Sequence, residues 1–295
     1  MAKLALLPAV VALAGAQPHV VARIPTGAAP AGATAAFGAV WVANDGAGTI
    51  ARIDPRTNRV TRRIRLKPGP FSLTHGFGAL WVDNYKRQSL TRVDPRSGRA
   101  RSVRIGAVPF DVVAAFGRIW ATAWDAGTLV EVDPASLRVV RRTAIGPRPT
   151  GLAVADGALW VGFGRSATSV ARVDPQTHEL ERIPVGVRAP SWFTAAGGSL
   201  WIQGADNVLV GLDPATRTVV GRLSFGRTLA QGATAADGTL WMPDKEQSRV
   251  YRIDPKAGRV LDSFAAGPGA FFALRAFGSM WVTSYAGNDV WRFGQ

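Results

Sequence analysis

The chain has 295 residues, of which 47% are hydrophobic and 19% are charged, and its formal net charge is +15. This composition is typical of a globular protein with a large buried core and excludes an intrinsically disordered chain. Because the chain contains no cysteine, disulfides, thiolate metal sites, cysteine nucleophiles and a lipoprotein anchor are all excluded.

The first residues have the parts of a secretory signal. Lys3 gives a positive start, residues 4–13 form an apolar run, and Ala14-Gly15-Ala16 matches a signal-peptidase site. The run is too short to span a bilayer. We therefore expect residues 1–16 to be a cleaved signal peptide and residues 17–295 to form one domain of an extracytoplasmic protein, either secreted or periplasmic. The alternative is a short buried or frayed apolar N-terminus.

Tryptophan marks a repeat of about 40 residues along the rest of the chain. Seven tryptophans are separated by 39 to 41 residues, and each stands directly after an apolar residue and three residues after a glycine: Trp41, Trp81, Trp120, Trp160, Trp201, Trp241 and Trp281. A very small side chain stands two residues before each of these glycines. A period of this length indicates a propeller or a solenoid.

A second signal, Asp-Pro, recurs about thirteen residues after six of the tryptophans, as in Asp174-Pro175. Asp caps its own turn and Pro presets the next φ, so we interpret these aspartates as structural.

One repeat, residues 148–186, divides into four strands. We expect strands at 151–155, 158–162, 169–174 and 179–184, with Asp156-Gly157 as a tight hairpin turn between the first two. Four short antiparallel strands per repeat are typical of a propeller blade, so the sequence predicts an all-β, seven-bladed β-propeller. In such a ring the small residues face the crowded axis, and the tryptophans fill the wedges between blades.

The two ends of the chain are expected to close the ring. The last repeat has a third strand at 289–293 and stops before a fourth, whereas residues 19–24 match a fourth strand and precede the first complete repeat. Pairing of these two segments would complete the seventh blade and remove two exposed sheet edges.

The repeat resembles a known group of bacterial propellers. Residues 38–44, Gly-Ala-Val-Trp-Val-Ala-Asn, followed by residues 49–55, Thr-Ile-Ala-Arg-Ile-Asp-Pro, resemble YVTN-type repeats and those of the virginiamycin B (streptogramin) lyase propellers. The resemblance covers residues 17–295 but consists of blade motifs. In the lyases it implies a magnesium ion held by glutamates and a histidine base that opens a cyclic depsipeptide by elimination.

The residues that would carry this chemistry do not match. Where the lyase repeat tends to place glutamate, this chain has other residues: Asn44, Asn84, Phe163, Gly204, Asp244 and Ser284. Of the three histidines only His75 falls on an inner strand, where we interpret it as a hydrogen-bonded packing residue. We therefore carry over no catalytic residue and expect no cofactor.

A carboxylate metal site is the alternative. Asp111 is the one acid near the start of an inner strand, and further acids on the loops between second and third strands could reach inward: Asp45, Asp125, Asp206, Asp244 and Glu246. These residues would hold Mg²⁺ or Ca²⁺ at the channel mouth.

Aromatic residues that break the repeat gather in the loops of one predicted face. The candidate ligand-binding residues are Tyr85, Phe110, Trp124, Trp192, Phe271 and Tyr285, with Asp111 as their polar anchor. Aromatics at a concave mouth favour recognition of a peptide, a glycan or a small amphipathic ligand. Hydrophobic plugging of the upper channel is the alternative interpretation.

These observations favour a non-catalytic ligand-binding or protein-interaction scaffold. The alternative is a metal-dependent lyase or lactonase on the same ring, which would act as a metal-assisted carbon–oxygen lyase. The arginines are scattered through the repeats and form no single run, which favours a solvated outer rim over a nucleic-acid interface. We expect a monomer with no nucleic-acid partner. An anionic cell-envelope surface is a further candidate partner.

The signal peptide yields the first testable prediction. Cleavage after Ala16 is expected to give an exported protein that begins at Gln17, which N-terminal sequencing of the exported chain would reveal. Retention of Met1 in that protein would contradict the prediction.

Overall fold

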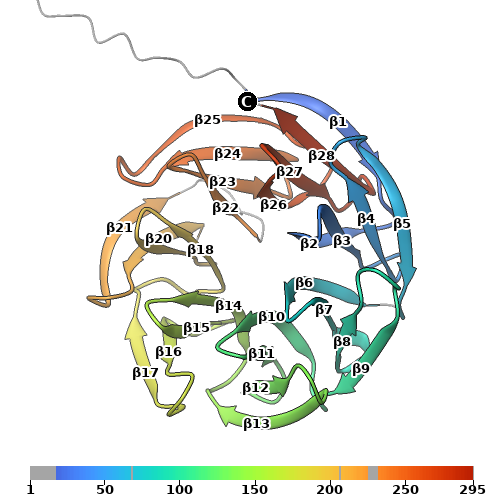
Figure 1. Ribbon diagram of the computed structural model, residues 1–295. Coiled ribbons are helices and arrows are strands. Elements are labelled where there is room, and N and C mark those ends of the chain that lie inside the picture. The colour runs from blue at the N-terminus through green and yellow to red at the C-terminus, as the bar shows by residue number, and fades with distance from the viewer. Residues whose placement is uncertain (1–17, 68, 206, 225–231, 295) are drawn as a thin grey trace, which may run out of the picture.

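The computed structural model describes residues 18–67, 69–205, 207–224 and 232–294. The expected signal peptide, residues 1–16, lies outside the described residues. Seven four-stranded antiparallel sheets surround a common axis, and Figure 1 shows them as the blades of a ring. The predicted seven-bladed β-propeller is confirmed.

Each blade runs from an innermost strand to an outermost one. Blade 1 consists of β2 (Pro30–Ala36), β3 (Ala39–Asn44), β4 (Thr49–Asp54) and β5 (Arg59–Arg65). Blade 2 consists of β6 (Pro70–Gly76), β7 (Ala79–Asn84), β8 (Ser89–Val93) and β9 (Ala100–Arg104), with the short 3₁₀ helix η1 (Tyr85–Arg87) between β7 and β8. Blade 3 consists of β10 (Pro109–Ala115), β11 (Arg118–Ala123), β12 (Thr128–Asp133) and β13 (Arg138–Ala144).

The remaining blades repeat this order. Blade 4 consists of β14 (Pro149–Ala155), β15 (Ala158–Phe163), β16 (Ser169–Val173) and β17 (Leu180–Pro184). Blade 5 consists of β18 (Trp192–Ala196), β19 (Ser199–Gln203), β20 (Val208–Asp213) and β21 (Thr218–Ser224). Blade 6 consists of β22 (Thr234–Ala236), β23 (Thr239–Asp244), β24 (Arg249–Asp254) and β25 (Arg259–Ala265). Blade 7 consists of β26 (Ala270–Ala276), β27 (Ser279–Ser284), β28 (Asp289–Gly294) and β1 (His19–Pro25).

The four strands expected in residues 148–186 are all present. Their bounds differ from the prediction by one residue at most, except that β14 starts two residues earlier, at Pro149. Pro149 pairs with Phe163 beyond a bulge that precedes Leu152, and a bulge of this kind leaves no mark in the alternation of side chains. No helix among the described residues has the length and apolar character needed to cross a membrane.

The chain termini close the ring as predicted. β1 pairs antiparallel with β28, from His19 opposite Gly294 to Pro25 opposite Asp289. Figure 1 shows β1 along the outer edge of blade 7. Ile24 is buried at the contact between blade 7 and blade 1. The seventh blade therefore combines the two ends of the chain.

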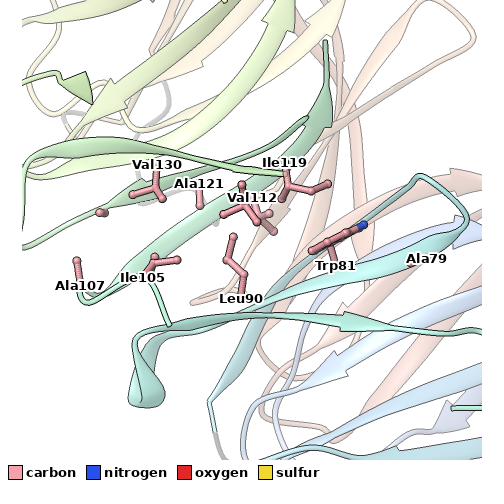
Figure 2. Packing of buried hydrophobic residues seen from close by; sticks show 11 residues of the cluster. Ala79, Trp81, Leu90, Ile105, Ala107, Val112, Ile119, Ala121 and Val130 are labelled. Carbon is pink, nitrogen blue, oxygen red and sulfur yellow. The ribbon is translucent and has the colours of Figure 1, made fainter. Parts of the chain in front are cut away.

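The repeat tryptophans fill the wedges between neighbouring blades. Seven hydrophobic clusters of described residues correspond to the seven blade interfaces, and each contains one of the seven tryptophans. Figure 2 shows Trp81 of blade 2 packed with Leu90 against blade 3. Burial of such a ring contributes about 4–6 kcal/mol at about 25 cal/mol per Å².

The small residues near the axis have two functions. In five blades the tryptophan indole N–H donates to the carbonyl of the small residue five positions earlier, at 3.0–3.1 Å. At Gly76 a Cβ atom would lie 2.5 Å from the Cβ of Ala114 on the next blade. At this position the inner strands of blades 2 and 3 are therefore too close for a larger side chain, as the sequence predicted.

The Asp-Pro turns lie on one face of the ring, here called the lower face, together with the hairpin turns between the first two strands of each blade. In all six Asp-Pro turns the aspartate Oδ1 accepts the N–H group two residues later. At Asp133 the N–H of Ser136, three residues later, also donates to this oxygen at 2.7 Å and lowers the pKa of the carboxyl. These aspartates are structural, as predicted.

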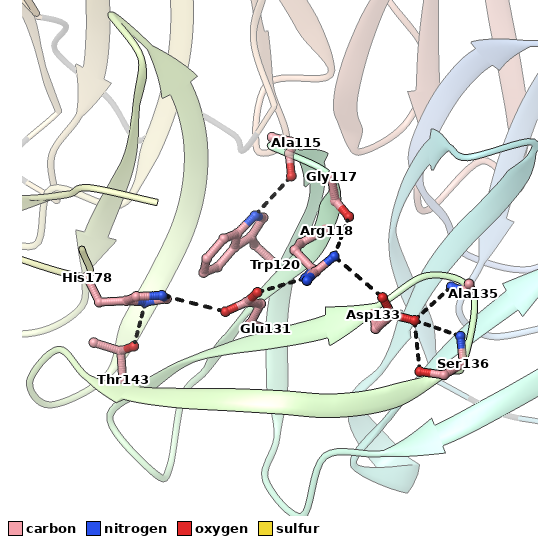
Figure 3. A network of polar contacts seen from close by, with 10 residues as sticks. All are labelled: Ala115, Gly117, Arg118, Trp120, Glu131, Asp133, Ala135, Ser136, Thr143 and His178. Atoms are coloured by element: carbon pink, nitrogen blue, oxygen red, sulfur yellow. Dashed lines mark hydrogen bonds and ion pairs between the residues drawn. The ribbon is translucent and has the colours of Figure 1, made fainter. Parts of the chain in front are cut away.

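A polar network on the lower face connects blades 3 and 4, and Figure 3 shows it from close by. Arg118 contacts Glu131 at 2.9 Å and Asp133 at 3.4 Å, and His178 of blade 4 lies 3.7 Å from Glu131. His178 therefore contributes to the contact between blades 3 and 4 and lies away from the axis of the ring.

Ring closure provides a stability prediction. Deletion of residues 19–24 is expected to lower the free energy of unfolding by about 3 kcal/mol or more, because it removes the burial of Ile24 and a row of strand hydrogen bonds. Thermal melts would show a fall in Tm of roughly 5–10 °C. Val21→Ser on the exposed side of β1 is the control and is expected to melt within about 2 °C of the unchanged chain. Equal Tm values for the deleted and complete chains would contradict the importance of this closure.

Candidate functional site

Aromatic side chains gather on the upper face, where the loops between blades meet the loops between second and third strands. The start of the inner strand carries an aromatic residue in blades 2, 3, 5 and 7: Phe71, Phe110, Trp192 and Phe271. The three phenylalanines stand ten residues before the repeat tryptophan of their blade, and Trp192 stands nine before Trp201. At this second position blades 1, 4 and 6 have a glycine: Gly32, Gly151 and Gly232. The aromatic and small residues thus form a pattern around the mouth of the channel.

The glycines are required because neighbouring chain segments approach them closely. A Cβ atom at Gly151 would lie 2.4 Å from the carbonyl oxygen of Ser191, and one at Gly32 would lie 2.7 Å from that of Phe71. With only hydrogen at these positions, rings of the flanking blades meet across the intervening blade. Phe110 of blade 3 contacts Trp192 of blade 5 in this way, with ring centroids 5.4 Å apart.

The rings form two groups. In the first, Phe71 contacts Tyr85 at 6.2 Å and Phe271 at 5.6 Å, and Phe271 contacts Tyr285 at 5.4 Å. In the second, Phe110 stacks on Trp124 at 5.3 Å and also contacts Trp192. The two groups form opposite sides of the mouth and leave a space between them.

A cavity of about 290 Å³ occupies this space, and we call it the aromatic notch. Its lining consists of Phe71, Asp83, Tyr85, Val108, Pro109, Phe110 and Trp124. A second cavity of about 210 Å³ lies over the channel axis, and its walls include Ser72, Asp111, Trp192 and Phe271. We call it the axial cavity.

The seven candidate residues all lie on the upper face but divide between these spaces. Tyr85, Phe110 and Trp124 line the notch, whereas Asp111, Trp192 and Phe271 line the axial cavity. Tyr285 lies behind Phe271, in contact with its ring. The structure therefore offers two adjoining spaces where the sequence suggested a single site across the axis.

Asp111, the expected polar anchor, is already fully engaged by the protein. Its Oδ1 accepts the Ser72 hydroxyl at 2.5 Å and the Val112 N–H at 2.8 Å, and its Oδ2 accepts the Leu152 N–H at 2.8 Å. Burial raises the pKa of this carboxyl, and the three donors oppose that rise. Asp111 thus connects blades 2, 3 and 4 at the floor of the mouth.

Asp83 is the polar residue of the notch that the sequence interpretation missed. Its Oδ1 accepts the N–H groups of Ser72 at 2.6 Å and Phe71 at 3.1 Å, and its buried Oδ2 has no partner among the described residues. Burial raises the pKa of Asp83 well above its usual value, and the charges of Asp111 and Asp45 add to this rise. The carboxyl is therefore held toward its neutral form, with one oxygen buried and without a hydrogen-bond partner among the described residues.

A repeat signal could have identified Asp83. It stands two residues after Trp81, where the other blades have uncharged residues: Ala43, Thr122, Gly162, Gln203, Pro243 and Thr283. A carboxylate in the middle of a buried strand therefore breaks the repeat as clearly as the loop aromatics do.

Asp45 connects the two tyrosines on the other side of the notch. The Tyr285 hydroxyl donates to Oδ2 of Asp45 at 2.8 Å, and the Tyr85 hydroxyl donates to its Oδ1 at 3.1 Å. Burial, with the hydrogen bond to Asp45, raises the pKa of Tyr285 to about 12. Both rings are therefore fixed as neutral hydrogen-bond donors, and blades 7, 1 and 2 are joined at the mouth.

Metal ligation was the alternative role for the acids of this face. Among the described residues no three His, Asp or Glu side chains gather in an arrangement that could hold a metal ion. Asp125 accepts the Val108 N–H and Asp244 accepts the Gln247 N–H, while Asp206 lies outside the described residues. His75 lies 2.8 Å from the Thr34 hydroxyl, so the expected hydrogen bond is present, but its side chain is exposed and the expected packing role is wrong.

Comparison with known proteins supports the architecture. No protein-family model and no curated protein matches the chain. A streptogramin B lyase structure superposes with a TM-score of 0.79 at 15% identity, covering 94% of this chain and 96% of the lyase. The predicted resemblance to the streptogramin lyase propellers is thus confirmed for the fold.

Two other solved propellers are similar to the same extent. Hydrazine synthase of Kuenenia stuttgartiensis matches with a TM-score of 0.77 at 13% identity, over 91% of this chain and 96% of that one. The β-propeller domain of Cps50 (Swd1) of Myceliophteria thermophila matches with a TM-score of 0.76 at 13% identity, over 95% of this chain and all of that domain. The names of these proteins imply unrelated functions, so the fold alone does not select one.

The raised pKa of Asp83 predicts a pH effect on stability. Between about pH 4, where an unfolded aspartate titrates, and the higher native pKa, the native state binds more protons than the unfolded state. The free energy of unfolding is therefore expected to fall as pH rises, by at most about 1.4 kcal/mol per pH unit for this group. Asp83→Asn is expected to remove this contribution and become relatively more stable between pH 4 and pH 7.

Urea unfolding of both chains at several pH values would measure this difference. The contributions of carboxyl groups that lie away from the mouth are common to both chains and cancel in the comparison. A stability difference that stays constant from pH 4 to pH 7 would contradict the neutral form of Asp83.

Proposed function

We propose that the protein is a non-catalytic, extracytoplasmic binding propeller whose upper face takes a small amphipathic ligand. The aromatic notch supports this proposal most strongly. Its walls are aromatic rings, and its one carboxyl has an oxygen that is buried and unpaired within the described chain. Apolar walls with one oriented polar group are typical of small-molecule sites.

The geometry indicates how such a ligand would bind. An apolar or aromatic body would lie between Tyr85 and Phe71 on one side and the Phe110–Trp124 stack on the other. A polar group at its inner end would pair with Oδ2 of Asp83 and satisfy an oxygen whose isolation otherwise costs about 1–3 kcal/mol. Since the walls come from blades 2 and 3, binding requires no change in the ring and is compatible with a monomer.

A metal-assisted carbon–oxygen lyase or lactonase is the second candidate. The observation in its favour is the buried Oδ2 of Asp83, which has no partner among the described residues and could serve as one ligand oxygen. Mg²⁺ or Ca²⁺ would be the metal. Elemental analysis of purified protein before and after chelation tests this candidate, which requires one tightly held ion that the chelator removes.

Removal of an aromatic wall tests the binding function. The neutral fluorophore N-phenyl-1-naphthylamine, which has an aromatic body and one N–H group, is the probe. Trp124→Ala is expected to weaken its binding by about 2 kcal/mol, roughly 30-fold, because buried aromatics dominate such contacts. Fluorescence titration measures the affinity, and urea unfolding of the same variant measures its stability.

Trp160→Ala is the matched control. Its ring lies in the core between blades 4 and 5, so the truncation is expected to cost about 3–5 kcal/mol of stability. If Trp124→Ala and Trp192→Ala destabilise the protein as strongly as Trp160→Ala, the upper aromatics are a hydrophobic plug and the proposed function is wrong.

A further inference from the structure

A cationic groove lies beside the aromatic notch, between the outer parts of blades 1 and 2. Its volume is about 920 Å³, and its walls come from the end of β5 and the two residues after it, from η1 and from β9. Five of its lining residues are basic and none is acidic: Arg65, Lys67, Lys86, Arg87 and Arg104. All five are exposed. The groove is therefore a concentrated positive surface in the upper face.

The charges of the groove are largely uncompensated within the described chain. Lys86 Nζ lies 4.0 Å from Asp45, and no ion pair or hydrogen bond of the other four side chains is present among the described residues. The remaining lining is mostly neutral and polar, including Gln88, Ser89 and Thr91. Like charges gathered in this way repel one another and raise the local concentration of anions.

The groove exists because blade 2 lacks an arginine that other blades have. In four blades an outermost-strand arginine occupies one register position and donates to a carbonyl just after the outermost strand of the preceding blade: Arg63, Arg142, Arg182 and Arg222. The distance is 3.2 Å from Arg63 Nε to the Thr26 oxygen and 2.8 Å from Arg222 Nη2 to that of Val185. These bridging arginines fill the gap between the outer parts of two blades.

Ser102 of β9 occupies the equivalent position in blade 2. It pairs with Thr91 in the sheet just as Arg63 pairs with Ala51, and its hydroxyl lies 2.9 Å from that of Thr91. Ser102 and Thr91 both line the groove. A short side chain at this position thus leaves open the space that a guanidinium fills elsewhere.

Tyr85 joins the groove to the notch, because its side chain forms a wall of both cavities. Its ring lies against Phe71 on the notch side, and Lys86 Nζ lies 5.4 Å from its centre. We propose that the groove is the anion-binding part of the ligand site, so that the ligand is a small amphipathic anion with a sulfate, phosphate or carboxylate group. This inference rests on the proposed function of the notch.

A pair of probes with the same aromatic body tests the inference. 8-Anilino-1-naphthalenesulfonate carries a sulfonate, and N-phenyl-1-naphthylamine is its uncharged counterpart. The unchanged protein is expected to bind the sulfonate more tightly, with an affinity that falls as salt is added. The double variant Arg87→Gln/Arg104→Gln is expected to lose about tenfold in sulfonate affinity, with the neutral probe unaffected.

Two further variants distinguish the effect of the groove on binding from the effect of the protein's net charge. Arg138→Gln/Arg141→Gln on β13 removes the same charge outside the groove and is expected to leave both affinities unchanged. Ser102→Arg adds a positive charge but is expected to fill the groove, reach the Leu66 carbonyl and weaken sulfonate binding by about tenfold. Attraction by net charge alone would instead strengthen it.

The outcomes distinguish this inference from the proposed function. Equal affinities for the two probes, unchanged by Arg87→Gln/Arg104→Gln, would overturn the anion site and leave the notch as a binding site. Stronger sulfonate binding by Ser102→Arg would also overturn it. Binding of neither probe would overturn both.

Discussion

The structure depends on the packing of one tryptophan from each blade against the next blade. A four-stranded sheet of this size has one face that it cannot bury alone, and the indole ring covers that face only when the neighbouring blade is in place. The wedge shape of each gap leaves room for a large ring away from the axis, and the inner strands end on alanine or glycine beside the tryptophan. Stability is therefore shared around the ring, and β1 completes it by joining β28.

The same constraint determines where function can be placed. Inner strands and wedges are committed to packing, so variation without loss of the ring is possible mainly in the loops and at isolated strand positions. The glycines of blades 1, 4 and 6 show how strict the limit is, since even a Cβ at Gly151 would collide with the next loop. Aromatic residues in the other blades use the space above these glycines and build the mouth. At Asp111 the needs of the fold and of a binding site conflict, because both carboxylate oxygens already accept hydrogen bonds from blades 2, 3 and 4.

The sequence predicted what depends on local pattern and on the repeat. Tryptophan spacing, Asp-Pro turns and small inner residues determine the blades, and the incomplete last repeat revealed the closure. Residue preferences for turns were less informative at the hairpins between the first two strands. Phe77-Gly78 adopts the same left-handed turn as Asp156-Gly157, with φ of +52° at Phe77. The register of the flanking strands imposes this turn on a phenylalanine that would otherwise avoid it. The bridging arginines bond residues 37 positions away, and the unpaired oxygen of Asp83 depends on what the neighbouring elements leave unfilled. Such contacts become visible only when the register of each strand is known.

Departures from the repeat are concentrated in blade 2 and its neighbours, and this concentration is itself informative. Asp83 places a buried carboxyl where other blades have uncharged residues. Ser102 cannot make the hydrogen bond to the preceding blade that an arginine makes in four other blades, and η1 places Lys86 and Arg87 beside the space that remains. Each departure lowers stability, through an unpaired buried oxygen, a lost interblade hydrogen bond or repulsion between cations. A ring built from seven identical copies of the common blade would have none of these features. Proteins retain locally unfavourable arrangements chiefly where they bind or react. The notch and the groove share Tyr85, and both include residues of blade 2. Blade 2 therefore combines the apolar walls, the free carboxyl oxygen and the positive surface that one amphipathic anion would require.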